Sequence, residues 1–282
     1  MDKSTYAHEF THALQDQHFD LDALDPEGNS DDASLAVAAL IEGDATLLMQ
    51  QYMLEYLDPN ELFDLFSESL DAGSEALEQA PAVIREQMMF PYEVGLTFVQ
   101  ALYQHGGYQA VNAAFARPPR STEQVLHPDR YLAGELPQVV NALPLTNTLG
   151  SGWEWVDGNV LGELTLRLYL EEQVNTRTAA SAADGWGGDW YDVYTHQGSG
   201  AIVMVMQTVW DTEAEAAEFI QTYQTFGKAR FGSASQAPTQ TSTCWSGSDA
   251  ICAYHSGTQT LVIRAPDMEL VTQLAVLFPD FY

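Results

Sequence analysis

The sequence predicts an α+β protein in two parts, a mainly helical N-terminal part followed by a small sandwich of antiparallel strands and helices. Helix-forming segments with apolar residues at three- and four-residue steps dominate residues 1–150. Alternating strand-like runs, interleaved with two helical segments, are concentrated after residue 186. With 282 residues, of which 46% are hydrophobic, the chain is long enough for two lobes with cores of their own.

The N-terminal part reads as a succession of helices separated by breakers. Residues 6–17, YAHEFTHALQDQ, contain no breaker, and residues 31–57 form one long helix that Asp58-Pro59 ends. Further helices are expected at 61–72, 82–89, 92–104 and 108–116. The proline-punctuated stretch 116–138 is expected to be mainly extended.

The C-terminal part alternates between strands and helices. A connector is expected at 142–159, a helix at 161–173, a glycine-rich loop at 181–190, strands at 190–196 and 201–210, a capped helix at 212–231, a hairpin at 252–265 and a closing helix at 268–278. This order resembles one duplicated β-β-α unit. We therefore predict a helical lobe at 1–150, a helical connector at 151–185 and an α+β lobe at 186–282.

Two cysteines, Cys244 and Cys252, flank a turn-like segment rich in Ser, Gly and Asp. Strand-like residues surround that segment, so we expect a disulfide that closes a hairpin; two unpaired thiols are the alternative. A disulfide would indicate an oxidising compartment. Two cysteines are too few for a cysteine-based zinc site.

Acidic side chains dominate the charge of the chain. Lys and Arg number 10 and Asp and Glu number 40, which gives a formal net charge of −30. Such a surface repels nucleic acid and anionic lipid, so we expect neither as a partner. It suits an extracellular enzyme, or a protein in high salt where self-repulsion is screened. No apolar run approaches the roughly 18 residues that a membrane-spanning helix needs.

Residues 8–12 spell HEFTH on the first predicted helix. His8 and His12 are four residues apart, so their imidazoles leave the same face of the helix. This spacing lets one helix supply two corners of a tetrahedral zinc site. Glu9 lies about 100° around the helix, where it can take a proton from a zinc-bound water and pass it to a leaving amine. A solvated helix without chemistry is the alternative.

A third ligand is expected from the next long helix. Glu42 lies among apolar residues, where a carboxylate is costly unless it is paired or bound to metal. Gly43 beside it would let a backbone or a substrate approach closely. Asp16 and Asp44 could receive the free N–H of a ligating histidine. Alternatively, Glu42 is a surface residue and another carboxylate is the ligand: Asp20, Asp22 or Asp25.

The combination of HEFTHALQD with EGDA at residues 42–45 resembles the gluzincins, the thermolysin-like clan of zinc metallopeptidases. The chain is also similar to uncharacterised bacterial secreted or lipid-anchored proteins that contain HALQDQHF, EGDA and RSTEQVLHP. The resemblance covers about residues 1–135. It implies a zincin-like lobe, Zn2+ bound by His8, His12 and Glu42, and Glu9 as the general base. It implies no activity for the C-terminal lobe.

The start of the chain departs from the gluzincin pattern. Gluzincins place a helix and a small sheet before HExxH, and the edge strand of that sheet aligns the substrate. Only seven residues precede His8. We therefore expect either a degenerate member or a fragment that has lost this sheet. A signal sequence or lipid anchor upstream of Met1 would fit the fragment, and with it an extracellular or cell-surface location.

Gluzincins also use a Tyr or His to donate to the transition state, and no motif identifies that residue here. His127 follows a segment that could lie across the cleft, and Tyr92 lies at a predicted helix start; structural packing is the alternative for both. His18 lies off the metal face, about 120° from the ligands. Three other histidines are interpreted as structural: His105, His196 and His255.

These interpretations predict a zinc-dependent enzyme that hydrolyses peptide bonds in a peptide or protein substrate. The alternative is a catalytically inactive zincin-like module that binds or regulates outside the cell. The sequence contains no GxSxG, no P-loop and no GxGxxG after a strand, so other enzyme classes find little support.

Overall fold

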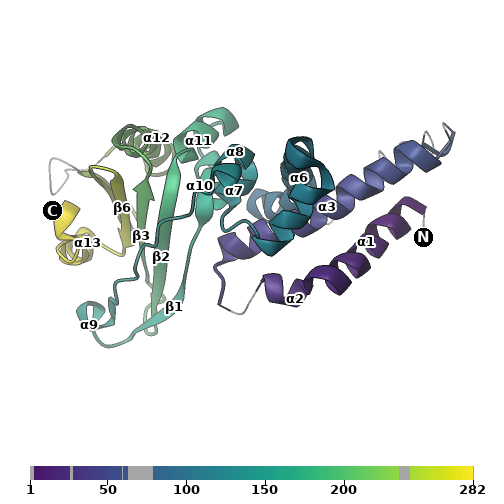
Figure 1. Ribbon diagram of the computed structural model, residues 1–282. Coiled ribbons are helices and arrows are strands. Elements are labelled where there is room, and N and C mark those ends of the chain that lie inside the picture. Colours follow the sequence, from purple (N-terminus) through teal and green to yellow (C-terminus); the bar gives the residue numbers. More distant parts are fainter. Residues whose placement is uncertain (1–2, 26–27, 59, 63–78, 235–241, 282) are drawn as a thin grey trace. The chain divides into compact units, whose positions relative to one another are not determined.

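The computed structural model describes residues 3–25, 28–58, 60–62, 79–234 and 242–281 (Figure 1). The chain forms two compact units, Met1–Leu136 (unit 1) and Pro137–Tyr282 (unit 2). The described residues of unit 1 are helical, and unit 2 contains a six-stranded antiparallel sheet. The predicted α+β class is therefore confirmed. No helix in the described part of the chain has both the length and the apolar character needed to cross a bilayer.

Unit 1 is a set of helices: α1 (Lys3–Phe19), α2 (Leu21–Leu24), α3 (Asp31–Tyr56), α6 (Ala82–Ala116), α7 (Thr122–Leu126) and α8 (Pro128–Ala133). The start of α3 is capped by Ser30, whose hydroxyl accepts from the backbone N–H of Ala33. Three predicted helices join into α6, whose helical backbone is interrupted at Gly106 and Gly107. The predicted helix at 61–72 lies almost entirely outside the described residues.

The stretch 116–138 is not extended, as predicted, but forms α7 and α8. Buried polar contacts hold these short helices in place. Asp32, at the start of α3, accepts from the backbone N–H of Thr122 at 3.2 Å, and Glu123 pairs with Arg130. Pro128 lies in the first turn of α8, where its missing N–H costs no hydrogen bond. The prolines therefore mark helix boundaries here.

Unit 2 consists of α9 (Thr146–Leu149), β1 (Trp153–Asn159), α10 (Gly162–Glu171), α11 (Thr176–Ala183), β2 (Trp186–His196), β3 (Ile202–Trp210), α12 (Glu213–Phe231), β4 (Ser242–Ser246), β5 (Ala250–Ser256), β6 (Gln259–Ala265), α13 (Met268–Ala275) and a 3-10 helix at Pro279–Phe281. The strand order is β1-β2-β3-β6-β5-β4, and all neighbours are antiparallel. Each half thus contains three strands and a following helix, one strand more than the predicted β-β-α unit.

Apolar side chains of the sheet alternate between its two faces, as the two-residue period of a strand requires. In β3, Val203 and Val205 pack with α13, whereas Met204 and Met206 pack with α12. Helices α10 and α11 cover the same face as α12 (Figure 1). The central strands of the sheet are therefore buried on both faces, between two separate apolar cores, whereas the edge strand β1 is largely exposed.

The segment 151–185, predicted as a helical connector, is an integral part of unit 2. Its strand β1 pairs with β2 along Trp153–Asn159. Asp189 of β2 is buried and accepts from the backbone N–H groups of Leu161 and Gly162, at the start of α10. Burial raises the pKa of Asp189 to about 6. The predicted loop at 181–190 instead ends α11 and begins β2, and the boundary between the units falls after residue 136, not after 150.

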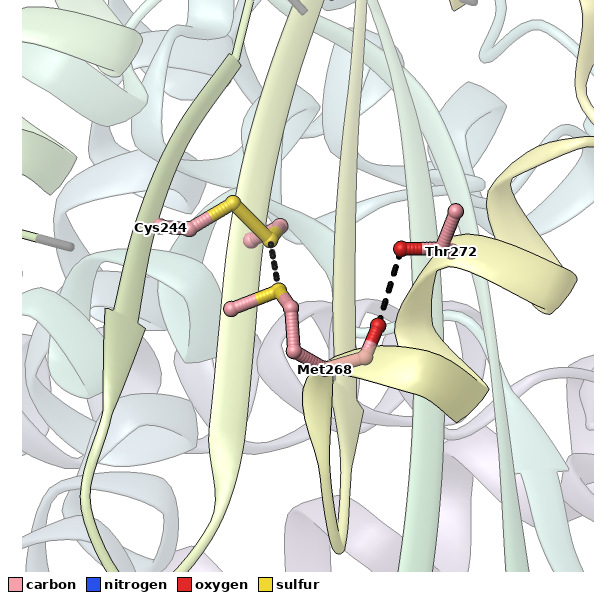
Figure 2. The surroundings of a disulfide bond; sticks show 4 residues. Cys244, Met268 and Thr272 are labelled. Atoms are coloured by element: carbon pink, nitrogen blue, oxygen red, sulfur yellow. Dashed lines mark hydrogen bonds between the residues drawn. A yellow bond between two sulfur atoms is a disulfide. The ribbon is translucent and has the colours of Figure 1, made fainter. Parts of the chain in front are cut away.

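A disulfide joins Cys244 and Cys252, which confirms the pairing that the sequence predicts (Figure 2). The two residues lie directly opposite each other in the β4–β5 ladder, with Cα atoms 4.1 Å apart. Met268 of α13 brings its sulfur to 3.6 Å from Cys252 Sγ. Since neither sulfur carries a proton, this is a packing contact. The disulfide therefore forms part of the core beneath α13.

Replacing both cysteines, Cys244→Ser with Cys252→Ser, is expected to lower the free energy of unfolding by about 2–3 kcal/mol. The reason is that an eight-residue separation closes a short loop in the unfolded chain. Denaturant unfolding of the oxidised protein measures this change. A reductant should destabilise the wild type and leave the double variant unchanged; equal responses would contradict the assignment.

Candidate metal centre

Helix α1 turns a polar face toward α3. The side chains on that face are Ser4, His8, Thr11, His12 and Gln15, all buried or half-buried. In contrast, Tyr6 is 61% exposed and Phe10 is 52% exposed. An amphipathic helix held by hydrophobic burial shows the reverse arrangement. The hydrophobic effect therefore does not explain why this face of α1 is buried. The polar side chains on it must be held there by other interactions.

Three potential ligand atoms converge between α1 and α3. His8 Nε2 lies 3.1 Å from Glu42 Oε2 and 3.1 Å from His12 Nε2, and His12 Nε2 lies 3.3 Å from Glu42 Oε2. Ligands about 2.0–2.1 Å from a tetrahedral zinc ion lie about 3.3 Å from one another. The triangle therefore has the edge length that a zinc ion requires. We call these three residues the ligand cluster.

The ligand cluster is partly open to solvent and electrostatically paired. The side chains of His8, His12 and Glu42 are 13%, 23% and 22% exposed. The hydrogen bond with Glu42 raises the pKa of His12. Burial alone would raise the pKa of Glu42, but the hydrogen bond and charge of His12 outweigh it and the pKa is lowered. A proton on His12 is therefore the competitor that a metal ion has to displace.

Gln15 orients His12. Its amide nitrogen donates to the Ile41 carbonyl at 3.0 Å and to Asp44 Oδ2 at 2.9 Å. A carbonyl can only accept, so the amide oxygen of Gln15 must face His12 Nδ1, which lies 2.8 Å away. His12 then donates from Nδ1, and its Nε2 lone pair points into the ligand cluster.

The structure changes both predictions for the carboxylates around the histidines. Asp44 is buried, which raises its pKa, and it reaches His12 only through Gln15. Asp16 instead accepts from the backbone N–H of Leu21 at 3.3 Å, in the turn after α1. Gln15 was missed, although its position seven residues after His8, on the same helix face, was a usable signal.

The ring of His8 is held by fewer hydrogen bonds than the ring of His12. Its Nδ1 is buried and has no hydrogen-bond partner among the described residues. Its ring lies roughly parallel to the ring of Tyr92, with centroids 6.3 Å apart and planes at 29°. Because Nδ1 has no partner, the tautomer of His8 depends on the group that its other ring nitrogen, Nε2, contacts.

Tyr92 of α6 lies against the ligand cluster. Burial, and after it the charge of Glu42, raises the pKa of its phenol, so the hydroxyl lies near that carboxylate. The phenol therefore keeps its proton in neutral solution. His127, the other predicted donor, lies where α7 meets α8 and is not part of the ligand cluster.

Glu9 lies beside the ligand cluster without joining it. Its side chain is exposed, on the helix turn that carries His8. Its negative charge contributes to the raised pKa of both His12 and Tyr92, so it is close to both. Glu9 follows His8 directly, so its side chain leaves the helix about 100° around from that of His8.

A close crossing of α3 and α6 brings Glu42 and Tyr92 together. A Cβ atom on Gly43 would lie 2.2 Å from the carbonyl oxygen of Gly95, and one on Gly95 would lie 2.3 Å from that of Ala39. The two backbones therefore touch where neither helix has a side chain. Glu42 precedes Gly43, and Tyr92 lies about one turn before Gly95. The predicted close approach at Gly43 is confirmed, and the approaching backbone is that of α6.

The comparisons with known proteins concern unit 2. Residues 149–275 match a family model described as a domain of unknown function (DUF8575). No curated protein and no solved structure matches the chain. The matched region does not include the ligand cluster, which lies in unit 1.

Replacing Gln15 with Leu is expected to weaken metal binding about 10- to 100-fold, because His12 loses the acceptor that sets its tautomer. Competition with a chromogenic chelator measures the affinity. Asp16→Asn is the matched control on the same helix and should bind within about twofold of the wild type. Equal losses in both variants would contradict the role assigned to Gln15.

Replacing Gly95 with Ala is expected to lower the free energy of unfolding by about 1–3 kcal/mol, since its methyl group would overlap the α3 backbone. Denaturant unfolding measures the effect. Gly247→Ala is the control, because a Cβ atom there meets nothing within 4 Å. If Gly95→Ala is as stable as the control, the two helices do not need this contact.

Proposed function

We propose that unit 1 carries a zinc-dependent peptide-hydrolase site of the gluzincin type. The observation that carries the proposal is the ligand cluster, with edges of 3.1, 3.1 and 3.3 Å. Its two histidines lie on a face of α1 that buries polar side chains in place of apolar ones. Helix packing alone does not require three ligand atoms at the spacing of a zinc site.

The donor set favours zinc over the hard cations. Two imidazole nitrogens and one carboxylate suit Zn2+, whereas Mg2+ and Ca2+ prefer oxygen ligands throughout. Three protein ligands and a side open to solvent are typical of a catalytic zinc site rather than a structural one. Iron(II) can bind the same donor set, so the metal analysis described below must also identify which metal is bound.

The side chains around the ligand cluster can perform the proton transfers of hydrolysis. A bound zinc ion would supply Lewis acidity and lower the pKa of water at the site to about 7. Glu9, exposed beside the cluster, can accept the proton of the attacking water and pass it to the leaving amine. Tyr92 keeps its phenol proton and can donate to the developing negative charge. Of the two predicted donors, Tyr92 is therefore better supported than His127.

The proposal includes the substrate class and the location. The substrate would be a peptide or a protein, since a net charge of −30 disfavours nucleic acid. The disulfide supports an oxidising compartment, and we propose an extracellular or cell-surface location on that ground.

One observation favours a non-catalytic alternative, a zincin-like module that binds or regulates outside the cell. A gluzincin aligns its substrate along an edge strand, and the described residues of unit 1 include no strand. Metal binding and hydrolysis therefore have to be measured separately.

Metal analysis of the purified protein is expected to find about one zinc ion per chain, because the ligand cluster has one set of donors. His8→Ala and Glu42→Ala should each lose the metal. Glu9→Gln should keep the metal and lower casein hydrolysis about 100-fold or more, because it removes the general base. Asp16→Asn, which removes an exposed carboxylate from the same helix, is the control and should retain activity.

The outcomes separate the two functions. Zinc binding with no Glu9-dependent hydrolysis would support the binding module. Absence of zinc, or zinc that survives both His8→Ala and Glu42→Ala, would overturn the metal site itself.

A further inference from the structure

Unit 2 contains a cavity of about 550 Å³ on the face of the sheet that α12 covers. This volume lies within the range of small-molecule sites. Half of its lining residues are polar or charged, and the other half are aromatic and aliphatic side chains from α10, α12, β3 and β5: Tyr169, Met204, Tyr223, Phe226, Phe231 and Ile251. We propose that this cavity binds an aromatic monocarboxylate. The proposal concerns unit 2 alone and does not depend on the metal site.

At the wall of the cavity, one tyrosine hydroxyl proton has no acceptor among the described residues. The hydroxyl oxygens of Tyr169 and Tyr223 lie 3.1 Å apart, and Tyr223 is fully buried. Burial raises the pKa of both phenols, so both keep their protons. Two hydroxyls carry two protons, and the bond between them uses only one. The second proton is available to an acceptor in the cavity, such as a carboxylate oxygen.

Positive charge is also concentrated at this cavity. The chain has 10 basic residues against 40 acidic ones, and two of the basic residues line this cavity, Arg230 and Arg264. The charges of both act on the hydroxyl of Tyr169. Asp249 accepts from Arg264 Nε at 2.8 Å and so holds that guanidinium in place. Arg230 is exposed at the end of α12, where it can pair with an entering anion.

Two acidic residues in the lining of the cavity disfavour a ligand with more than one negative charge. Glu172 and Asp249 also line the cavity and balance the formal charges of the two arginines. A carboxylate is therefore accommodated by Arg230 and the tyrosine proton, whereas a polyphosphate would meet two like charges.

The walls favour an aromatic group as the rest of the ligand. The rings of Tyr169 and Phe226 have centroids 4.8 Å apart and planes at 38°, and those of Phe226 and Phe231 are 6.3 Å apart at 68°. An aromatic ring of the ligand could pack against these side chains in the same tilted or edge-to-face geometry. The carboxylate then lies beside Tyr169 and Arg230, and the ring lies against the aromatic wall.

Isothermal titration calorimetry of the full, oxidised chain with 3-phenylpropionate tests the proposal. We expect saturable binding with a dissociation constant of about 0.1–1 mM, as suits a ligand of this size. The neutral analogue 3-phenylpropan-1-ol should bind about tenfold more weakly, because it has no charge for Arg230.

Two variants locate the site. Arg230→Gln should weaken 3-phenylpropionate binding about tenfold, and Tyr169→Phe, which keeps the ring and removes the proton, should weaken it about fivefold. Arg177→Gln is the control, because Arg177 is an exposed arginine of α11 that does not line the cavity. No saturable binding, equal affinity for the alcohol, or equal losses in Arg177→Gln and Arg230→Gln would each overturn the proposal.

Discussion

The backbone contact between α3 and α6 determines the geometry of unit 1. Gly43 and Gly95 let the two helices touch where any side chain would overlap a carbonyl oxygen. The contact fixes Tyr92 beside Glu42, and the adjoining face of α3 receives the polar side of α1. There the two histidines of α1 meet Glu42 at 3.1 and 3.3 Å. Glu42 of α3 is therefore the residue on which the contacts from α1 and α6 converge.

Around the ligand cluster, polar groups replace the usual apolar packing between helices. Such groups are tolerated in a half-buried setting only when they have hydrogen-bond partners. Gln15 meets this condition by linking Asp44 and the Ile41 carbonyl to His12. His8 Nδ1 is the exception, without a partner among the described residues. Hydrogen bonds thus orient the ligand cluster on the His12 side, whereas His8 has no corresponding link at its Nδ1.

Unit 2 is held together differently, by a sheet whose central strands are buried on both faces. Strand side chains alternate between the α13 core, which contains the disulfide, and the core beneath α10, α11 and α12. On the second face, aromatic rings surround a cavity that also receives two arginines. If this face of the sheet served stability alone, apolar side chains that filled the cavity would stabilise the fold more.

The sequence by itself determined what depends on local spacing. His8, Glu9 and His12 take their relative positions from helix geometry, and Cys244 and Cys252 meet because a short turn separates two strands. Tertiary structure decided what depends on how separate elements cross. Contacts between distant segments produce the link through Gln15, place Tyr92 rather than His127 against the ligand cluster, and make β1 part of unit 2. Spacing along a helix is a property of a few consecutive residues, whereas the crossing of two helices or the pairing of two strands depends on packing across the whole unit.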